Sequence, residues 1–517
     1  MQLAKTYCVS LIGLAGTLIE VEADISSNLP GFTLVGLPDA SLSEATARVR
    51  AATANSKMPL PNRKVTVNLS PAAVPKFGSI FDLAIAVSAL AAAEKINDPE
   101  ISETVYLGEL GLDGSVRAIN GVLPAVLAAK RHGFSRVVVP QANLAEATLV
   151  NDIECIGVSH LTQVLRMHGS EIDEIRVSER SRVSEPGGKQ QTIDLADIQG
   201  QDSAVNAMVI AATGGHHLLM VGPPGVGKTM MAERMTTILP DLTLEQSLET
   251  TAIHSVARVR GQVGANLISR PPFESPHHTA SASALVGGGV GVPSPGIISM
   301  SHNGILFLDE APEFQSPALE SLRQALESGT ISIARSIGVA RYPARFQLVM
   351  AANPCPCGMA LTANRNCVCT AKAKLKYLNR LSGPLLDRVD IRIQVRNLNQ
   401  AQISMAQQDS QCMTSAKAKE IVIAAREILK SRLVPLGYEL VSHVPPTLLR
   451  STLRPPKSVT AIIDSALQRG LVSMRGYDRC LRVALSIAAM DGRDEICSAD
   501  LDQSFLLRGP DQLASAA

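Results

Sequence analysis

The sequence contains no tryptophan, and only 3% of its 517 residues are aromatic. Its hydrophobic cores must therefore be built mainly from Ala, Val, Leu, Ile and Met, which suits Ala-rich helices packed on aliphatic strands. A charge excess is also missing, because 48 Lys and Arg residues face 47 Asp and Glu residues. This balance excludes a global attraction to nucleic acid or to an anionic membrane, so any anion-binding surface must be local.

Long apolar runs are missing as well. No run reaches the roughly 18 apolar residues that a membrane-spanning helix needs, because charges or prolines interrupt every candidate. Acidic residues follow the apolar N-terminal stretch without a small-residue cleavage site, so we expect paired strands there. Nine cysteines, an odd number, favour reduced thiols over a disulfide framework. We therefore expect a cytoplasmic protein without a membrane partner.

The chain is too long for one core and divides into segments of different pattern. Residues 1–170 alternate short aliphatic runs with helical patterns, which predicts an α+β domain. Residues 171–191 are charged and then carry Pro and Gly, which is typical of a linker. Residues 192–396 run helix, strand, Gly-rich loop and helix, which predicts a parallel α/β sheet. Residues 397–517 are almost entirely helical in pattern, so the fold class is a multidomain α/β protein.

A glycine-rich loop gives the strongest functional signal. The motif G-x4-G-K-T follows an apolar strand and precedes a helical run, which is the context of a P-loop. Such a loop turns backbone N–H groups towards phosphates, its Lys reaches the β and γ oxygens, and its Thr is a Mg²⁺ ligand. We therefore expect ATP and Mg²⁺, with a chance Gly-rich turn as the alternative. The nucleotide-binding residues are Gly222, Pro223, Pro224, Gly225, Val226, Gly227, Lys228 and Thr229.

A second apolar strand, in GILFLDE, ends in Asp309 and Glu310. We expect Asp309 to bind Mg²⁺ together with Thr229, through the metal's water shell, and Glu310 to orient and deprotonate the attacking water. An acidic pair after a strand is by itself often only the start of a helix. After a P-loop, it indicates hydrolysis.

Three further stretches resemble AAA+ ATPases. DIQGQDSA stands where these enzymes have their adenine-side segment, and FQLVMAANP ends in Asn353, where they have the sensor of the γ-phosphate. LSGPLLDRVDIRI carries Arg388, which resembles the arginine finger offered to a neighbouring subunit. The resemblance implies a ring, with a homo-hexamer as the expected form. The alternative for Arg388 is a surface ion pair with Asp387 or Asp390.

The helical pattern LVSMRGYDRCLRVALSIAAM places Arg475, Arg479 and Arg482 at helical spacing. It looks like a lid helix whose first arginine, Arg475, is the second nucleotide sensor. Arg479 is the second candidate for that role. A solvated basic helix face is the structural alternative.

Four stretches carry a more specific resemblance, to the ComM/YifB family of magnesium-chelatase-like AAA+ ATPases. They are SPHHTASASALVGGG, PGIISMSHNGILFLDEAPEF, ANPCPCG and YLNRLSGPLLDRVDIRI. The resemblance implies a hexameric, DNA-dependent ATPase, a helicase that drives branch migration in homologous recombination and in natural transformation. It implies branched or single-stranded DNA and recombination proteins as partners. It also implies a hairpin around Ser336-Ile337-Gly338, with Arg335 near the tip as either a phosphate contact or a solvated arginine.

The N-terminal segment resembles the proteolytic domain of Lon-type proteases through VPKFGSIFDLAIA and LGELGLDGSVRAINGVLPAVLAAKRHG. Peptidase chemistry there needs a Ser nucleophile beside a Lys base. Matching the motifs puts Ile80 at the serine position and Leu123 at the lysine position, while Ser79 and Lys76 are only neighbours. We therefore expect a scaffold or interaction domain without peptidase activity.

Two other patterns favour structural roles. Residues 39–43 fit the metal motif D-x-S-x-S, but Ser41 and Glu44 also form a capping box that opens a helix, and this is the preferred interpretation. His277 and His278 make a poor metal site alone and are expected in a loop beside a helix. The rival functions are a chelatase subunit that inserts Mg²⁺ into a porphyrin and an ATP-dependent unfoldase or protease. The N-terminal Lon-like segment and the cysteines favour the DNA motor over the chelatase.

Four cysteines crowd into residues 355–369, an insertion that begins two residues after Asn353. Cys355, Cys357, Cys367 and Cys369 form two C-x-C pairs, which predicts a closed tetrahedral Zn²⁺ site with a structural role. Reduced thiols without metal are the alternative. The chain then enters a basic run for which phosphate contact is a reasonable second role. That run comprises Lys372, Lys374, Lys376, Arg380, Arg388, Arg392 and Arg396.

Overall fold

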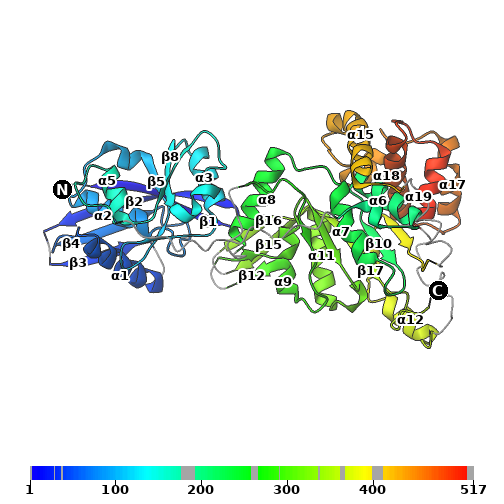
Figure 1. Ribbon diagram of the computed structural model, residues 1–517, viewed down its shortest axis with the longest axis horizontal. Coiled ribbons are helices and arrows are strands. Elements are labelled where there is room, and N and C mark those ends of the chain that lie inside the picture. Colours follow the sequence, from blue (N-terminus) through cyan, green and yellow to red (C-terminus); the bar gives the residue numbers. More distant parts are fainter. Residues whose placement is uncertain are drawn as a thin grey trace.

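The computed structural model describes residues 3–27, 29–36, 39–175, 193–257, 266–289, 292–335, 338–360, 367–398 and 412–508. Most of the predicted linker and the hairpin residues Ser336 and Ile337 lie outside these ranges. Figure 1 shows an elongated molecule in which an N-terminal sheet, a central sheet and a C-terminal group of helices follow one another along the long axis.

The N-terminal part is built on a seven-stranded mixed sheet in the order β3-β4-β2-β1-β5-β8-β9. The expected paired strands at the N-terminus are confirmed, because β1 and β2 form a long antiparallel pair from Ala4↔Ala23 to Ile12↔Ala15. Alternation decides which face is buried: in β4, KVTVNLS, every second residue is buried. The strands are β1 (Ala4–Ile12), β2 (Ala15–Ser26), β3 (Gly31–Val35), β4 (Lys64–Ser70), β5 (Thr104–Tyr106), β8 (Arg136–Pro140) and β9 (Glu154–Val158).

Helices cover this sheet and close one apolar core with it. Helix α2 is buried along almost its whole length, which suits its apolar sequence DLAIAVSALAA. The helices are α1 (Asp39–Asn55), α2 (Asp82–Ala92), α3 (Val122–Arg131), α4 (Leu144–Ala147) and α5 (Leu161–Met167), beside the short pair β6 (Glu109–Leu110) and β7 (Val116–Arg117). The predicted helix start at residues 39–43 agrees with α1, although the side chains there lie outside the described part.

The central sheet has five strands in the order β11-β14-β17-β10-β18, all parallel, which confirms the parallel α/β prediction. Its inner strands read as continuous apolar runs, because both faces of a parallel sheet are covered by helices. The strands are β10 (Leu218–Val221), β11 (Phe273–Glu274), β14 (Ile305–Leu308), β17 (Gln347–Ala352) and β18 (Ile391–Gln394).

Around this sheet lie the helices α6 (Asp202–Gly214), α7 (Lys228–Ile238), α8 (Leu244–Val256), α9 (Ala282–Val286), α10 (Ile297–Met300), α11 (Ser316–Ser328), α12 (Ala371–Leu378) and α13 (Gly383–Leu386). Two hairpins project beside it. One pairs β12 (Gly287–Gly288) with β13 (Ser294–Pro295), and the other pairs β15 (Thr330–Arg335) with β16 (Gly338–Pro343). The second is the hairpin expected from the sequence, with Arg335 at the end of β15.

In the described residues 412–508, every regular element is a helix or a 3-10 turn, as the pattern predicted. The helices are α15 (Ser415–Leu433), α16 (Pro446–Leu449), α17 (Lys457–Gln468), α18 (Met474–Met490) and α19 (Ser498–Arg508). Residues of α15 and α18, among them Ala418, Val422 and Val483, share one apolar cluster with strand β10. Packing is therefore continuous across the predicted boundary at residue 396, and the division into domains stays a prediction.

Among the described residues, no helix combines the length and the apolar character needed to cross a bilayer.

Candidate active site

The P-loop lies where strand β10 ends and helix α7 begins. Gly225 and Gly227 have φ angles of +80° and +86°, a backbone conformation that favours glycine. Gly227 is the N-cap of α7 and offers no side-chain cap, so the first N–H groups of that helix remain available for an anion. A side chain at Gly225 would meet nothing within 4 Å, which leaves open space in front of the loop. The loop therefore fits a phosphate group.

Lys228 points back into this loop and is buried. Its Nζ donates to the carbonyl oxygens of Gly222 and Pro223, both at 2.8 Å, and to Asn353 Oδ1 at 3.2 Å. Burial lowers the pKa of Lys228, while the charges of Asp309 and Glu310 oppose that shift. Asn353 thus reaches the same ammonium group as the loop, although the two are far apart in sequence.

The two predicted carboxylates follow strand β14. Thr229 Oγ1 donates to Asp309 Oδ2 at 2.7 Å, so the two expected Mg²⁺ ligands face each other. Glu310 has a φ of +50°, unusual for a residue with a side chain, and its N–H donates to Asp309 Oδ1 at 2.9 Å. The P-loop, Asp309 and Asn353 all follow carboxyl ends of parallel strands, where sheets of this type bind ligands.

One residue of the site was missed by sequence reasoning. His278 lies in the loop between β11 and α9, and its Nδ1 is 3.4 Å from Glu310 Oε2. The neighbouring His277 stacks on His278 with ring centroids 4.2 Å apart but bonds Thr279 instead. The expectation that both histidines belong to a loop is confirmed. The sequence could have pointed to His278 only through the rule that loops following parallel strands meet at one edge.

The four cysteines of the insertion come together just beyond Asn353. The Sγ atom of Cys355 lies 3.3 Å from that of Cys357 and 3.7 Å from that of Cys367, and Cys357 and Cys367 are 3.7 Å apart. The four sulfur atoms, that of Cys369 included, all lie within 4.8 Å of one another. Sulfurs about 2.3 Å from a tetrahedral Zn²⁺ are about 3.8 Å apart. The cluster therefore has the dimensions of a zinc site, and no other group of this kind occurs among the described residues.

The cysteine cluster also touches the P-loop. Gly358 has a φ of +77° and closes a tight turn in which its N–H donates to Cys355 O at 2.9 Å. A methyl group on Gly358 would lie 2.6 Å from Cδ and 2.9 Å from Cγ of Pro224. The turn therefore lies directly against the phosphate-binding loop.

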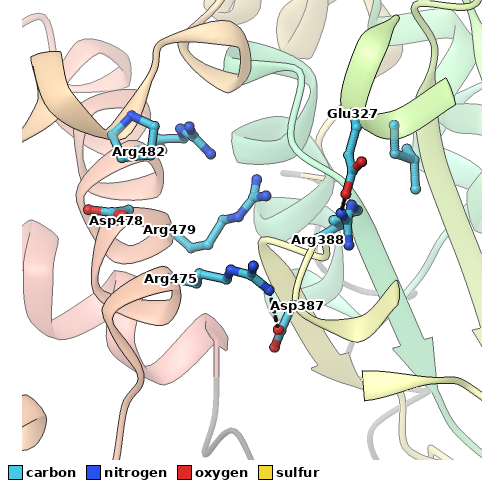
Figure 2. Close-up of a pocket in the computed structure, with 9 residues that line it drawn as sticks. Glu327, Asp387, Arg388, Arg475, Asp478, Arg479 and Arg482 are labelled. Carbon is cyan, nitrogen blue, oxygen red and sulfur yellow. Dashed lines mark hydrogen bonds and ion pairs between the residues drawn. The ribbon is translucent and has the colours of Figure 1, made fainter. Parts of the chain in front are cut away.

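The remaining arginines line a separate pocket of about 230 Å³ between helix α18 and the central sheet (Figure 2). Arg388 pairs there with Glu327 at the end of α11, not with Asp387 or Asp390 as the alternative interpretation had it. Asp387 pairs instead with Arg475 at 3.1 Å, so the predicted finger and the predicted lid sensor lie side by side. Burial lowers the pKa of Arg388, and nearby arginines add to the shift. The pocket is lined by the four arginines Arg388, Arg475, Arg479 and Arg482 and by the three carboxylates Glu327, Asp387 and Asp478, so cations are in slight excess there.

The three arginines of α18 differ in burial. Arg475 has a side chain 69% exposed, whereas Arg479 is 18% exposed and bonds the fully buried Asp390 at 2.7 Å. Arg482 is buried and donates to the Val444 carbonyl. Of the three arginines, only Arg475 therefore fits the alternative interpretation of a solvated basic helix face. Arg479 and Arg482 bond buried partners of the helix's surroundings, whereas Arg475 is the most exposed of the three and pairs with Asp387.

The pocket and the P-loop lie at opposite edges of the central sheet. Strands β10 and β18 are parallel with Leu218 level with Ile391, so Arg388, which precedes β18, lies at the amino ends of the strands. Asp390 N–H donates to the His217 carbonyl just before β10, which fixes this placement. The P-loop follows Val221 at the carboxyl end. Arg388 and Arg475 therefore face away from the P-loop of their own chain.

Three family models match the chain. The model described as magnesium chelatase, subunit ChlI, matches residues 194–403, the one described as subunit ChlI of Mg-chelatase matches residues 21–143, and the one described as magnesium chelatase, subunit ChlI C-terminal, matches residues 412–508. An uncharacterized Mycobacterium tuberculosis protein is 47% identical over 96% of this chain and 98% of its own length. Competence protein ComM of Haemophilus influenzae is 39% identical over 98% of this chain and 97% of its own. YifB of Escherichia coli is 38% identical over 99% and 98%.

The chain belongs to the ComM/YifB family of magnesium-chelatase-like proteins. Lon proteases also match, at 31% and 26% identity, over only about a third of the chain. This partial similarity agrees with the resemblance noted in the N-terminal motifs.

In this family member the expected Lon-type dyad positions are occupied by apolar residues. Leu123 is fully buried, and Ile80 is partly buried against the N-terminal core. Lys76 Nζ donates to the carbonyls of Pro71 at 2.6 Å and Val74 at 3.0 Å, while Ser79 donates to Glu109. Lys76 and Ser79 thus have separate partners. The absence of peptidase activity stays a prediction.

Proposed function

We propose that this ComM/YifB family member is an ATP-hydrolysing, ring-forming motor that acts on DNA. The contact between Thr229 and Asp309, beside a P-loop with an uncapped helix, is the observation that carries the ATPase assignment. When bound, Mg²⁺ would neutralise the negative charge of the phosphates and orient them. The P-loop amides and Lys228 would bind the phosphates, Thr229 and Asp309 would hold the metal, and Glu310 would take the proton of the attacking water.

The ring follows from the arginine pocket. Arg388 and Arg475 lie at the amino edge of the central sheet, whereas the P-loop lies at the carboxyl edge. An arginine at that edge acts on a γ-phosphate only when the nucleotide is bound to a neighbouring chain. We infer a closed homo-oligomer, with a hexamer as the expected size, in which each arginine pocket completes the site of the next subunit.

The assignment to DNA, in competence-related recombination, has three supports. A full-length relative bears the name competence protein ComM. The β15–β16 hairpin exposes two arginines, Arg335 at the end of β15 and Arg341 opposite the exposed Ser332. Helix α12 adds exposed Lys372 and Lys376 beside the cysteine cluster. Basic side chains on projecting elements suit phosphate contacts that depend on salt.

We further propose that Cys355, Cys357, Cys367 and Cys369 bind one structural Zn²⁺. The sulfur separations match a tetrahedral thiolate site, and four thiolates leave no open position for catalysis. The metal would fix the turn that lies against Pro224 and the strand end that carries Asn353. The proposed role of the metal is therefore to stabilise the backbone next to the nucleotide site.

Two variants test the ATPase assignment. Lys228→Ala should weaken nucleotide binding, because it removes the phosphate-facing ammonium. Glu310→Gln should bind ATP but hydrolyse it far more slowly, because an amide cannot take the proton of water. Equal loss of affinity in both variants would contradict these roles.

The rival function, insertion of Mg²⁺ into a porphyrin, is favoured by the descriptions of the matching family models. An ATPase assay with forked, branched and single-stranded DNA separates the two, because a chelatase motor should show no stimulation by any DNA structure.

A further inference from the structure

The N-terminal part touches the β15–β16 hairpin through the turn between β1 and β2. Gly13 in this turn has a φ of +66° and is buried. A methyl group on Gly13 would lie 2.9 Å from the carbonyl oxygen and 3.2 Å from the nitrogen of Arg341 in β16. The turn therefore packs on the hairpin backbone, and only glycine permits both the conformation and the close approach.

The side chains beside Gly13 extend this contact. Ile12 and Leu14 pack against the apolar cluster that underlies the hairpin, and Leu14 also packs against the N-terminal core. On the hairpin side that cluster contains Ile331 and Ile333 of β15 and Ala340 and Tyr342 of β16. The opposite face of the hairpin exposes Arg341, and Arg335 is exposed at the end of β15. The turn of β1 and β2 thus packs against the buried face of the hairpin that exposes these two arginines.

A second attachment lies at helix α8. The Gly121 N–H donates to the Ser255 carbonyl at 3.1 Å, and the Ser255 hydroxyl donates to the buried Glu146. Ala252 of the same helix belongs to the N-terminal apolar cluster. Because the N-terminal part is attached both at α8 and at the hairpin, it cannot rotate on one without disturbing the other. Figure 1 shows β1 reaching towards β15, β16 and α8.

We propose that the N-terminal part is a positioning element for the β15–β16 hairpin, which it holds at a fixed angle to the central sheet through Gly13 and Leu14. The proposal rests on the proposed role of the hairpin as a DNA contact. This role for the N-terminal, Lon-like part does not need a catalytic Ser-Lys dyad. It also places this support far from the P-loop, so nucleotide binding should not depend on it.

The test compares two glycine variants of the full-length protein. Gly13→Ala introduces a methyl group against Arg341, whereas Gly133→Ala introduces the same methyl group at a φ of +87° with nothing within 4 Å. Both variants carry the strain of a left-handed alanine, about 1 kcal/mol, so their difference isolates the contact. Leu14→Ala is the second variant, because it weakens the same contact without backbone strain and decides the matter if Gly13→Ala does not fold.

Three quantities are measured on each protein: nucleotide affinity, ATPase rate against DNA concentration, and hydrogen exchange of the β15 and β16 amides. We expect unchanged nucleotide affinity and unchanged ATPase without DNA in all variants. Gly13→Ala and Leu14→Ala should exchange faster in β15 and β16 and should need about fivefold more DNA for half-maximal stimulation. Gly133→Ala should match the wild type in both.

Two results would overturn the proposal: exchange in β15 and β16 that is the same in Gly13→Ala and Gly133→Ala, or full DNA stimulation despite faster exchange. If the wild-type protein shows no DNA stimulation, the proposed function fails. The exchange comparison then still decides whether the N-terminal part holds the hairpin.

Discussion

Gly358 of the cysteine turn lies against the ring of Pro224 in the P-loop, so closely that a methyl group on Gly358 would come within 2.6 Å of the proline Cδ. Two segments more than a hundred residues apart thus share one surface next to the nucleotide site. The turn of the cysteine cluster therefore contacts the P-loop directly.

The first prediction uses this contact. Gly358→Ala should lower nucleotide affinity about fivefold, because the new methyl group must displace Pro224. Zinc content should stay unchanged. Gly437→Ala is the matched control, since Gly437 has a φ of +83° and nothing within 4 Å of the added methyl group. Equal nucleotide affinity in the two variants, measured by titration, would show that the contact has no effect.

Elemental analysis of the purified protein should give about one Zn²⁺ per chain, because four thiolates at these separations close a tetrahedral site. The double variant Cys367→Ser/Cys369→Ser should lose the metal while its P-loop still binds ATP. Two results together would refute both the zinc site and its structural role. They are wild-type protein that carries no metal although it was prepared without chelators, and full DNA-stimulated activity in the double variant.

Arg388→Ala should leave assembly and ATP binding largely intact while hydrolysis collapses, because the arginine acts on the phosphate of a neighbour. Mixing this variant with Lys228→Ala tests the neighbour's role, since each supplies the half-site that the other lacks. Some activity should return at intermediate ratios. If mixed rings recover none at any ratio, although both variants assemble, the trans-acting role loses its support.

His278→Ala should slow hydrolysis at saturating ATP without changing nucleotide affinity, because Glu310 loses the side chain 3.4 Å from its carboxylate. His277→Ala provides the control: this ring stacks on His278 but bonds Thr279. Rates and affinities of both variants are compared with those of Glu310→Gln. A larger effect from His277 than from His278 would argue against a role in orienting Glu310.

Arg479→Ala should lower the free energy of unfolding by about 3–5 kcal/mol, because it leaves the buried Asp390 without its partner. Arg475→Ala should cost less than about 1 kcal/mol, since that pair is exposed. Burial would raise the pKa of Asp390, but Arg479 and His216 hold it well below its usual range. The loss should therefore be largest above the unfolded pKa of about 3.9 and shrink as the pH falls through the lower folded value. Chemical denaturation at several pH values measures both.

Local patterns predicted the P-loop, the acidic strand end and the paired N-terminal strands, because each depends on residues that are neighbours in sequence. The alternative prediction for Arg388, an ion pair with Asp387 or Asp390, was wrong because it considered only residues near Arg388 in the sequence. The structure pairs Arg388 with Glu327 at the end of α11. That contact depends on how distant segments of the chain pack together, and short sequence motifs do not predict such packing.

The contacts of His278 with Glu310, of Gly358 with Pro224 and of Gly13 with Arg341 were likewise outside the reach of the sequence. Each joins a loop or turn to a segment far away in the sequence, and the contact depends on how whole sheets pack. The four cysteines are an exception, since they are near one another in the sequence and metal chemistry predicts that their two C-x-C pairs converge without any knowledge of the fold.

The central claim is that this chain couples ATP hydrolysis to DNA. The most direct measurement is the ATPase rate of the wild-type protein with and without forked, branched and single-stranded DNA, beside Glu310→Gln as the blank. The account predicts that at least one DNA structure raises the wild-type rate, that the rise weakens with salt, and that Glu310→Gln shows neither basal nor stimulated hydrolysis. A wild-type rate that no DNA structure changes would contradict it.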